Sequence, residues 1–170
     1  MKVLVTYLSQ TGNTKKVAEA IFDEIKCEKE LATIAATTSL DDYDLVFAGF
    51  PVWQFGPAEP AKKFLEEHAA GKKLALFVTH AMDPETTDSA TRGILEGILD
   101  KCRSAAAAGE LEGFFNCRGE LSENVASFLL KSNEPAMRRF GEMRDLTVGY
   151  PDNDALNSAR IFAKEMMQKI

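Results

Sequence analysis

Six consecutive residues near the start of the chain carry groups of the kinds that can bind a phosphate. They are Ser9, Gln10, Thr11, Gly12, Asn13 and Thr14. Their hydroxyl and amide groups donate hydrogen bonds, and a glycine lets the backbone approach an anion closely. An amphipathic helical pattern begins directly after them, so an anion there would also meet the positive end of a helix dipole. The segment predicts a phosphate site, although the same residue types also suit an ordinary helix N-cap.

The charge of this segment narrows the kind of phosphate site. No lysine or arginine lies between Lys2 and Lys15, and Gly12 is followed by Asn13 and not by lysine. A Walker loop requires Gly-Lys-Ser/Thr, and the dinucleotide fingerprint requires G-x-G-x-x-G, which is also absent. Because its donors are neutral, this segment is not the phosphate-binding loop of a P-loop nucleotide hydrolase.

Segments with the apolar pattern of strands alternate along the chain with segments that have the hydrophobic spacing of helices. Apolar runs predict strands over residues 1–7, 30–35, 44–50, 73–79 and 111–117. Helical spacing predicts helices from Thr14 and over residues 60–70, 88–108, 122–131, 134–144 and 154–170, with one helical turn after Ser39. The alternation predicts one domain, residues 1–170, with a doubly wound three-layer α/β sandwich and a parallel sheet. Ligands of such folds bind at the carboxyl ends of the strands.

The loop after the third strand is the second candidate binding segment. It contains Pro51, Val52, Trp53, Gln54, Phe55 and Gly56. Its prolines predict that the strand does not continue into it. Trp53 can lie flat against a planar ligand or pack into the core beneath the next helix, and its place opposite the phosphate loop favours ligand contact.

The loop after the fourth strand is the third candidate. It contains Thr79, His80, Ala81, Met82 and Asp83. His80 and Met82 either border a ligand or serve as a solvated loop residue and a gap filler.

The phosphate segment after the first strand and the Gly49–Pro57 run after the third together resemble the flavodoxin family. The resemblance covers the order of elements over nearly the whole chain and implies a five-stranded sheet, order 2-1-3-4-5, with noncovalently bound FMN. By this likeness Ser9, Thr11, Gly12, Asn13 and Thr14 hold the phosphate. Residues 51–56 would run beside the isoalloxazine, and residues 79–83 would lie at its pyrimidine end.

Two features depart from the flavodoxin pattern. Electron-carrier flavodoxins usually place a tyrosine in the loop after the fourth strand, and this chain has none there. The outer flavin face would then be covered by His80 or Met82, or stay open to a partner or substrate. Residues 119–150 are also long for a connection, and they either dock a partner or cover the sheet.

The leading functional prediction is an electron carrier between redox partner proteins, using the FMN semiquinone and hydroquinone, with no catalytic residue of its own. Peptide groups near Gly56, the only glycine of its loop, would hydrogen-bond the reduced flavin. The alternative is an FMN-dependent NAD(P)H:quinone or small-molecule reductase, and an FMN-free interaction module is a third possibility.

Composition and charge set further expectations. The net charge of −6 disfavours nucleic acids and anionic membranes as partners. Cys27, Cys102 and Cys117 form no C-x-x-C pair, so no disulfide framework or metal site is predicted. No segment approaches the roughly 18 apolar residues of a membrane span. We therefore expect a cytoplasmic protein, monomeric or weakly dimeric, without membrane insertion.

Overall fold

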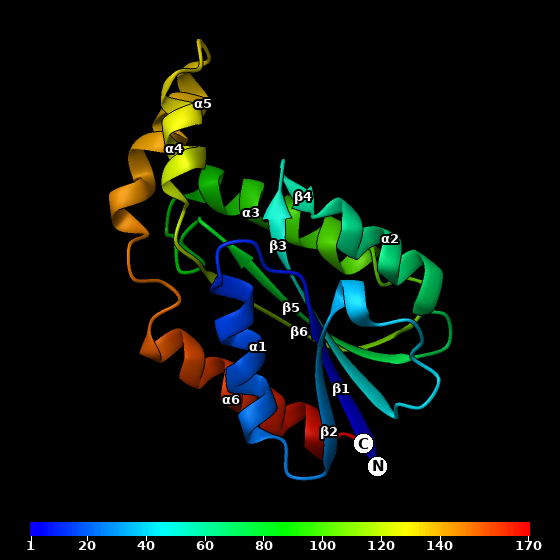
Figure 1. Ribbon diagram of the computed structural model, residues 1–170. Coiled ribbons are helices and arrows are strands. Elements are labelled where there is room, and N and C mark those ends of the chain that lie inside the picture. Colours follow the sequence, from blue (N-terminus) through cyan, green and yellow to red (C-terminus); the bar gives the residue numbers. More distant parts are fainter.

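The computed structural model describes residues 1–170 as a twisted parallel sheet between two layers of helices (Figure 1). The five long strands lie in the order β2-β1-β3-β5-β6, which is the predicted order. Their bounds are β1 Lys2–Tyr7, β2 Glu28–Thr33, β3 Leu45–Trp53, β5 Lys73–His80 and β6 Glu110–Arg118. The two-residue strand β4, Gly56–Pro57, pairs antiparallel with β3. The predicted doubly wound α/β fold is confirmed.

Helices cover both faces of the sheet. One layer consists of α1 (Asn13–Glu24) and α6 (Asn153–Gln168), and the other of α2 (Glu59–His68) and α3 (Ser89–Ser104). The shorter helices α4 (Glu123–Leu130) and α5 (Pro135–Glu142) follow β6, and 3₁₀ turns occupy Ile34–Ala36 (η1) and Met143–Leu146 (η2). Side-chain caps at Asp88, Ser122 and Asp152 start α3, α4 and α6.

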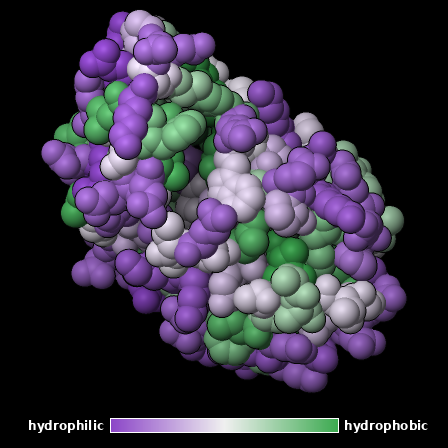
Figure 2. All heavy atoms as spheres, turned by 45° about the horizontal axis from the view of Figure 1, so that its top comes forward, coloured by the Kyte–Doolittle hydropathy of each residue, from purple (hydrophilic) through white to green (hydrophobic).

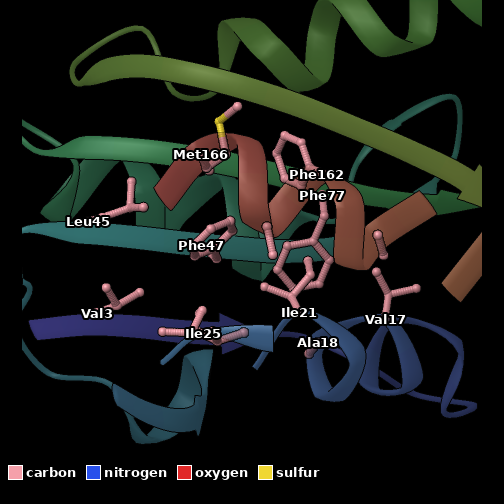
Figure 3. Close-up of a cluster of buried hydrophobic side chains, with 14 of the residues drawn as sticks. Val3, Val17, Ala18, Ile21, Ile25, Leu45, Phe47, Phe77, Phe162 and Met166 are labelled. Atoms are coloured by element: carbon pink, nitrogen blue, oxygen red, sulfur yellow. The ribbon is translucent and has the colours of Figure 1, made fainter. Parts of the chain in front are cut away.

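The sheet separates two hydrophobic clusters. On the side of α1 and α6, Ile21, Phe47 and Phe77 are completely buried (Figure 3). The rings of Phe47 and Phe162 meet edge to face with centroids 6.0 Å apart. Each fully buried side chain of this size stabilises the fold by about 1.5–3 kcal/mol. Both faces of the central strands are therefore buried, which explains their nearly continuous apolar sequence.

Three local predictions were wrong. Strand β3 continues through Pro51 to Trp53. The proline is tolerated because it lies at the end of the ladder, where β1 has already ended and Pro51 is opposite Thr79 near the end of β5. The 3₁₀ turn lies at Ile34–Ala36. After Ser39 there is only a single turn, closed from the Tyr43 amide to the Leu40 carbonyl, and the Ser39 hydroxyl accepts from the Asp41 amide and donates to the Asp41 carboxylate.

The third wrong boundary is the end of α3, which stops at Ser104 and not at Ala108. The Ala108 carbonyl accepts a hydrogen bond from the Gly71 amide instead. This contact ties the end of the helix to the turn that precedes β5, and short turns replace the last helical residues.

Residues 119–150 do not cover the sheet. They form a helical hairpin of α4 and α5 that stands at the carboxyl edge, above the rest of the molecule in Figure 1. The base of this hairpin is closed by hydrogen bonds from the Leu121 amide to Thr147 Oγ1 (2.9 Å) and from the Glu120 amide to the Tyr150 carbonyl (3.0 Å). The hairpin is thus attached to the fold mainly through its two ends.

Candidate functional site

The carboxyl ends of the strands open into a branched cleft of about 1600 Å³. Of the predicted site residues, all line this cleft except Gly12 and Asp83. Figure 2 shows the hollow between the lobe formed by α4 and α5 and the rest of the molecule, with hydrophobic residues along the side of that lobe. Three loops far apart in the sequence are therefore brought to one site by the parallel sheet.

In residues 9–14, which we call the phosphate loop, the backbone turns at Gly12 to begin α1. Gly12 adopts φ +94°, a left-handed conformation, and its amide donates to the Ser9 hydroxyl at 3.1 Å. A Cβ built on Gly12 would meet no atom within 4 Å, so the backbone here faces open space. The first amides of α1 lack intrahelical acceptors, and its first turn has no acidic residue. These features fit a bound phosphate group.

Two side chains of this loop have partners elsewhere in the fold. The hydroxyls of Thr14 and Thr79 lie 2.8 Å apart and both residues are buried. The side-chain amide Nδ2 of Asn13 donates to the backbone carbonyl of Glu120 at 2.9 Å. This bond joins the phosphate loop to the base of the α4–α5 hairpin. Gly119 permits this approach, because a Cβ there would lie 2.8 Å from Asn13 Nδ2. The Asn13 side chain is thus already partly engaged.

The Trp53 loop is a tight β-hairpin between β3 and β4. Its two turn residues, Gln54 and Phe55, have φ values of 48° and 62°. Gly56, the glycine of this loop, lies in β4 opposite Trp53, so the positive φ values fall on the two residues before it and not on the glycine. The Lys101 ammonium donates to the Phe55 carbonyl at 3.3 Å and holds the turn against α3. Trp53 is half-buried and lines the cleft, outside the three hydrophobic clusters.

His80 is the last residue of β5 and only 7% exposed, so the interpretation as a solvated loop residue was wrong. Its Nε2 lies 2.9 Å from Asn116 Oδ1, whereas the buried Nδ1 has no hydrogen-bond partner. Burial lowers the pKa of His80, and hydrogen bonding to Asn116 opposes that shift only in part. The imidazole is therefore neutral near pH 7.

Met82 and Asp83 differ in their relation to the cleft. Met82 is buried against Leu95, Ile98 and Leu99 of α3. It also lines the cleft, so it belongs both to the hydrophobic core and to the wall of the cleft. The Asp83 carboxylate accepts a hydrogen bond from the Glu85 amide at 3.0 Å and does not line the cleft.

Several residues that line the cleft were not among the site residues predicted from the sequence. The apolar ones come from the α4–α5 hairpin and are Val125, Phe128, Leu129, Met137 and Phe140. The available signal was the unusual length of residues 119–150 together with apolar side chains on short helices. Their position relative to the cleft depends on tertiary contacts, which spacing does not specify.

The winding order and the helix N-terminus at the switch point define a flavodoxin-like α/β protein. The flavodoxin domain family matches residues 4–164 of this chain. The chain belongs to this family.

A curated relative supports this membership over the full length. The flavodoxin-like domain-containing protein BilS of Clostridioides difficile is 31% identical over 179 residues, covering 99% of this chain and 98% of that protein.

Solved structures support the fold. Oxidised flavodoxin 2 from Bacillus cereus covers the whole of both chains, with a TM-score of 0.59 and 19% identity. A flavoprotein from Lactobacillus acidophilus, solved in complex with FMN, matches 68% of this chain and 92% of its own, with a TM-score of 0.52 and 23% identity.

No helix has both the length and the apolar character that a membrane crossing requires. No group of three or more His, Cys, Asp or Glu residues is arranged to hold a metal ion.

Proposed function

We propose that this protein binds FMN noncovalently and carries electrons between redox partner proteins. The observation that carries the proposal is the meeting of the phosphate loop, the Trp53 hairpin and the end of β5 in one cleft. Family membership and the FMN bound in the Lactobacillus acidophilus structure support the choice of cofactor.

Different residues would contact different parts of FMN. Ser9, Thr11 and the amides at the start of α1 would hold the phosphate, with Gly12 giving the backbone its required turn. Trp53 would lie beside the ring system, and the backbone at Thr79 to Met82 would face its polar edge. The cofactor supplies the redox chemistry, and the protein supplies binding, orientation and exclusion of water.

Spectroscopy and calorimetry test the cofactor. Purified protein should bind FMN in a 1:1 complex, and riboflavin, which lacks the phosphate, should bind more weakly by about tenfold or more, or ~1.4 kcal/mol. Equal affinity for the two flavins would contradict the role of residues 9–14. A protein that ignores added FMN would contradict the proposal itself.

Reductive titration tests the carrier function. Stepwise addition of dithionite to the FMN-loaded protein should show two separate one-electron steps, as a carrier between protein partners requires. A single two-electron reduction would count against this function.

The second candidate function is an FMN-dependent NAD(P)H:quinone or small-molecule reductase. It is favoured by the loop after β5, where no tyrosine is present and both His80 and Met82 are buried by contacts of their own. Rapid mixing with NADH or NADPH separates the two functions. Reduction within seconds would support the reductase, and flavin that stays oxidised for minutes would exclude it.

A further inference from the structure

Lys101 of α3 lies against the Trp53 hairpin, the segment that we assign to the flavin ring. Its ammonium donates to the Phe55 carbonyl at 3.3 Å, and the residue lines the cleft. We propose that Lys101 is a positioning residue for this end of the cleft. It holds the hairpin in place, and its charge favours a reduced, negatively charged cofactor over the oxidised one. The second part rests on the proposed function, whereas the first requires no cofactor.

The turn of the Trp53 hairpin has a backbone conformation that needs support from outside. Gln54 and Phe55 have φ values of 48° and 62°, and neither is a glycine. Non-glycine residues adopt this conformation at a cost, and they keep it where surrounding contacts fix them. Only two pairs of residues join β3 to β4. The turn therefore depends on contacts beyond its own short ladder.

Lys101 supplies such a contact with both its stem and its charged end. Strand β4 packs beside α3 (Figure 1). A Cβ built on Gly56 would lie 3.9 Å from Lys101 Cδ, so the methylene stem passes the hairpin at van der Waals distance. The ammonium beyond it reaches the Phe55 carbonyl, and a charged donor makes a stronger hydrogen bond than a neutral one. The side chain thus connects α3 to the turn.

The positive charge of Lys101 is not balanced by an ion pair. Lys62 and Lys101 are the two lysines that line the cleft, and Lys62 is paired with Glu66. Two other carboxylates of the lining also have cationic partners, which are Arg103 for Asp100 and Arg144 for Glu120. The fields of paired charges largely oppose each other at a distance. Lys101 is therefore the cation that acts on this end of the cleft.

A positive charge here has a defined effect on a bound flavin. Reduction adds negative charge to the cofactor, and opposite charges attract more strongly where water is partly excluded. The reduced cofactor would therefore bind more tightly relative to the oxidised one, and its midpoint potential would be higher. Lys101 is exposed to solvent, so salt should screen part of the effect.

Tryptophan fluorescence tests the positioning role without any cofactor. Trp53 is the only tryptophan of the chain, so its emission reports on the hairpin. Lys101→Met keeps an unbranched stem and removes the charge, and acrylamide should quench Trp53 more readily in this variant than in the wild type. Lys101→Arg keeps a charged donor and should retain the wild-type quenching. Equal quenching of the wild type and Lys101→Met would overturn the positioning role.

The midpoint potential of bound FMN tests the charge. Lys101→Met should lower the preference for reduced over oxidised FMN by about threefold, or about 30 mV for a one-electron step, and by less in high salt. Lys101→Gln should show the same shift, and Lys101→Arg should show none. An unchanged potential in Lys101→Met and Lys101→Gln, even with weaker FMN binding, would leave only a structural role and overturn the effect of the charge.

Lys62→Met is the matched control. It changes the net charge of the protein by the same amount and also removes a lysine from the cleft lining. The Lys62 ammonium is held toward Glu66, one turn further from β4 along α2, so we expect a smaller shift than in Lys101→Met. Equal shifts in the two variants would overturn the assignment to Lys101.

The two measurements also separate this inference from the proposed function. Wild-type protein that cannot be loaded with FMN overturns the proposed function, and the quenching experiment still decides the positioning role. Protein that holds FMN with the same potential in every variant overturns only the effect of the Lys101 charge.

Discussion

Thr14 and Thr79 form a buried hydroxyl pair beneath the phosphate loop, with their oxygens 2.8 Å apart. Thr14→Val removes one hydroxyl and leaves the other buried without its partner. We expect the free energy of unfolding to fall by about 1–3 kcal/mol, measured by urea denaturation. The double variant Thr14→Val/Thr79→Val should recover part of this loss, because neither oxygen is then left unpaired. A double variant with fully additive losses would contradict the direct pairing.

His80 makes stability depend on pH. Its folded-state pKa is lowered from 6.5 by burial, so below pH 6.5 the unfolded chain binds a proton that the folded protein does not. The stabilising contribution is present above pH 6.5 and is lost as the pH falls, with a slope of up to about 1.4 kcal/mol per pH unit. Denaturation between pH 5 and 7.5 should therefore show a shallower loss in His80→Gln than in the wild type. Parallel curves would contradict the prediction, since His68 is common to both proteins.

At the scale of single elements, the β3–β4 hairpin depends on two residues with positive φ. Gln54 has φ 48°, a conformation that asparagine adopts more readily than glutamine and that β-branched residues strongly disfavour. Gln54→Asn should raise the free energy of unfolding by a few tenths of a kcal/mol, and Gln54→Val should lower it by about 1 kcal/mol or more. Thermal unfolding checks the order Asn, Gln, Val, and any other order would contradict the turn geometry.

Strand β3 also depends on a close approach at Gly49. A Cβ on this residue would overlap the ring of Phe77, which is completely buried. Gly49→Ala should therefore lower the free energy of unfolding by about 1–3 kcal/mol through overpacking. Chemical denaturation of Gly49→Ala/Phe77→Leu provides the control, because the smaller side chain should offset part of the cost. A double variant that loses the sum of both single effects would show that the two residues do not interact.

At the scale of the whole molecule, the phosphate loop and the helical hairpin are joined although they lie 107 residues apart in the chain. The link is the hydrogen bond from the side-chain amide of Asn13 to the backbone carbonyl of Glu120. Asn13→Ala should increase amide hydrogen exchange over residues 119–150, because it removes one of the few ties at the base of the hairpin. Hydrogen-exchange mass spectrometry measures this effect. Gln10→Ala, an exposed residue of the same loop, is the control and should leave the exchange unchanged.

Much of the fold was predictable because local pattern and global winding agree. Alternating apolar runs and helical spacing, as in β1 and α1, reflect burial on both faces of a parallel sheet, and this burial leaves a strong signal in the sequence. The strand-to-helix turn at residues 9–14 was predictable for a similar reason, because hydroxyl, glycine and amide groups at such a turn are a local arrangement. The edge of the sheet at which a site would form also follows from the winding.

Other features were decided only by tertiary contacts. Pro51 can remain in β3 because its neighbours in the sheet end beside it, and no property of the proline itself shows this. His80 is buried at the end of β5, where its ring is hydrogen-bonded to Asn116 of β6. The Asn13 side chain is engaged because the segment after β6 brings the Glu120 carbonyl to the phosphate loop.

The sequence by itself therefore determined the class of fold, the winding order that its resemblance implied, and the donor groups that residues 9–14 present at the strand-to-helix turn. The tertiary structure decided how far the cleft extends and which helical hairpin forms its apolar side. The physical reason is the distance along the chain over which each kind of information acts. Residue types and their spacing encode backbone conformation and burial over a few turns. The walls of a cleft are built from segments about a hundred residues apart, such as Asn13 and Glu120, and these meet only when the sheet is assembled.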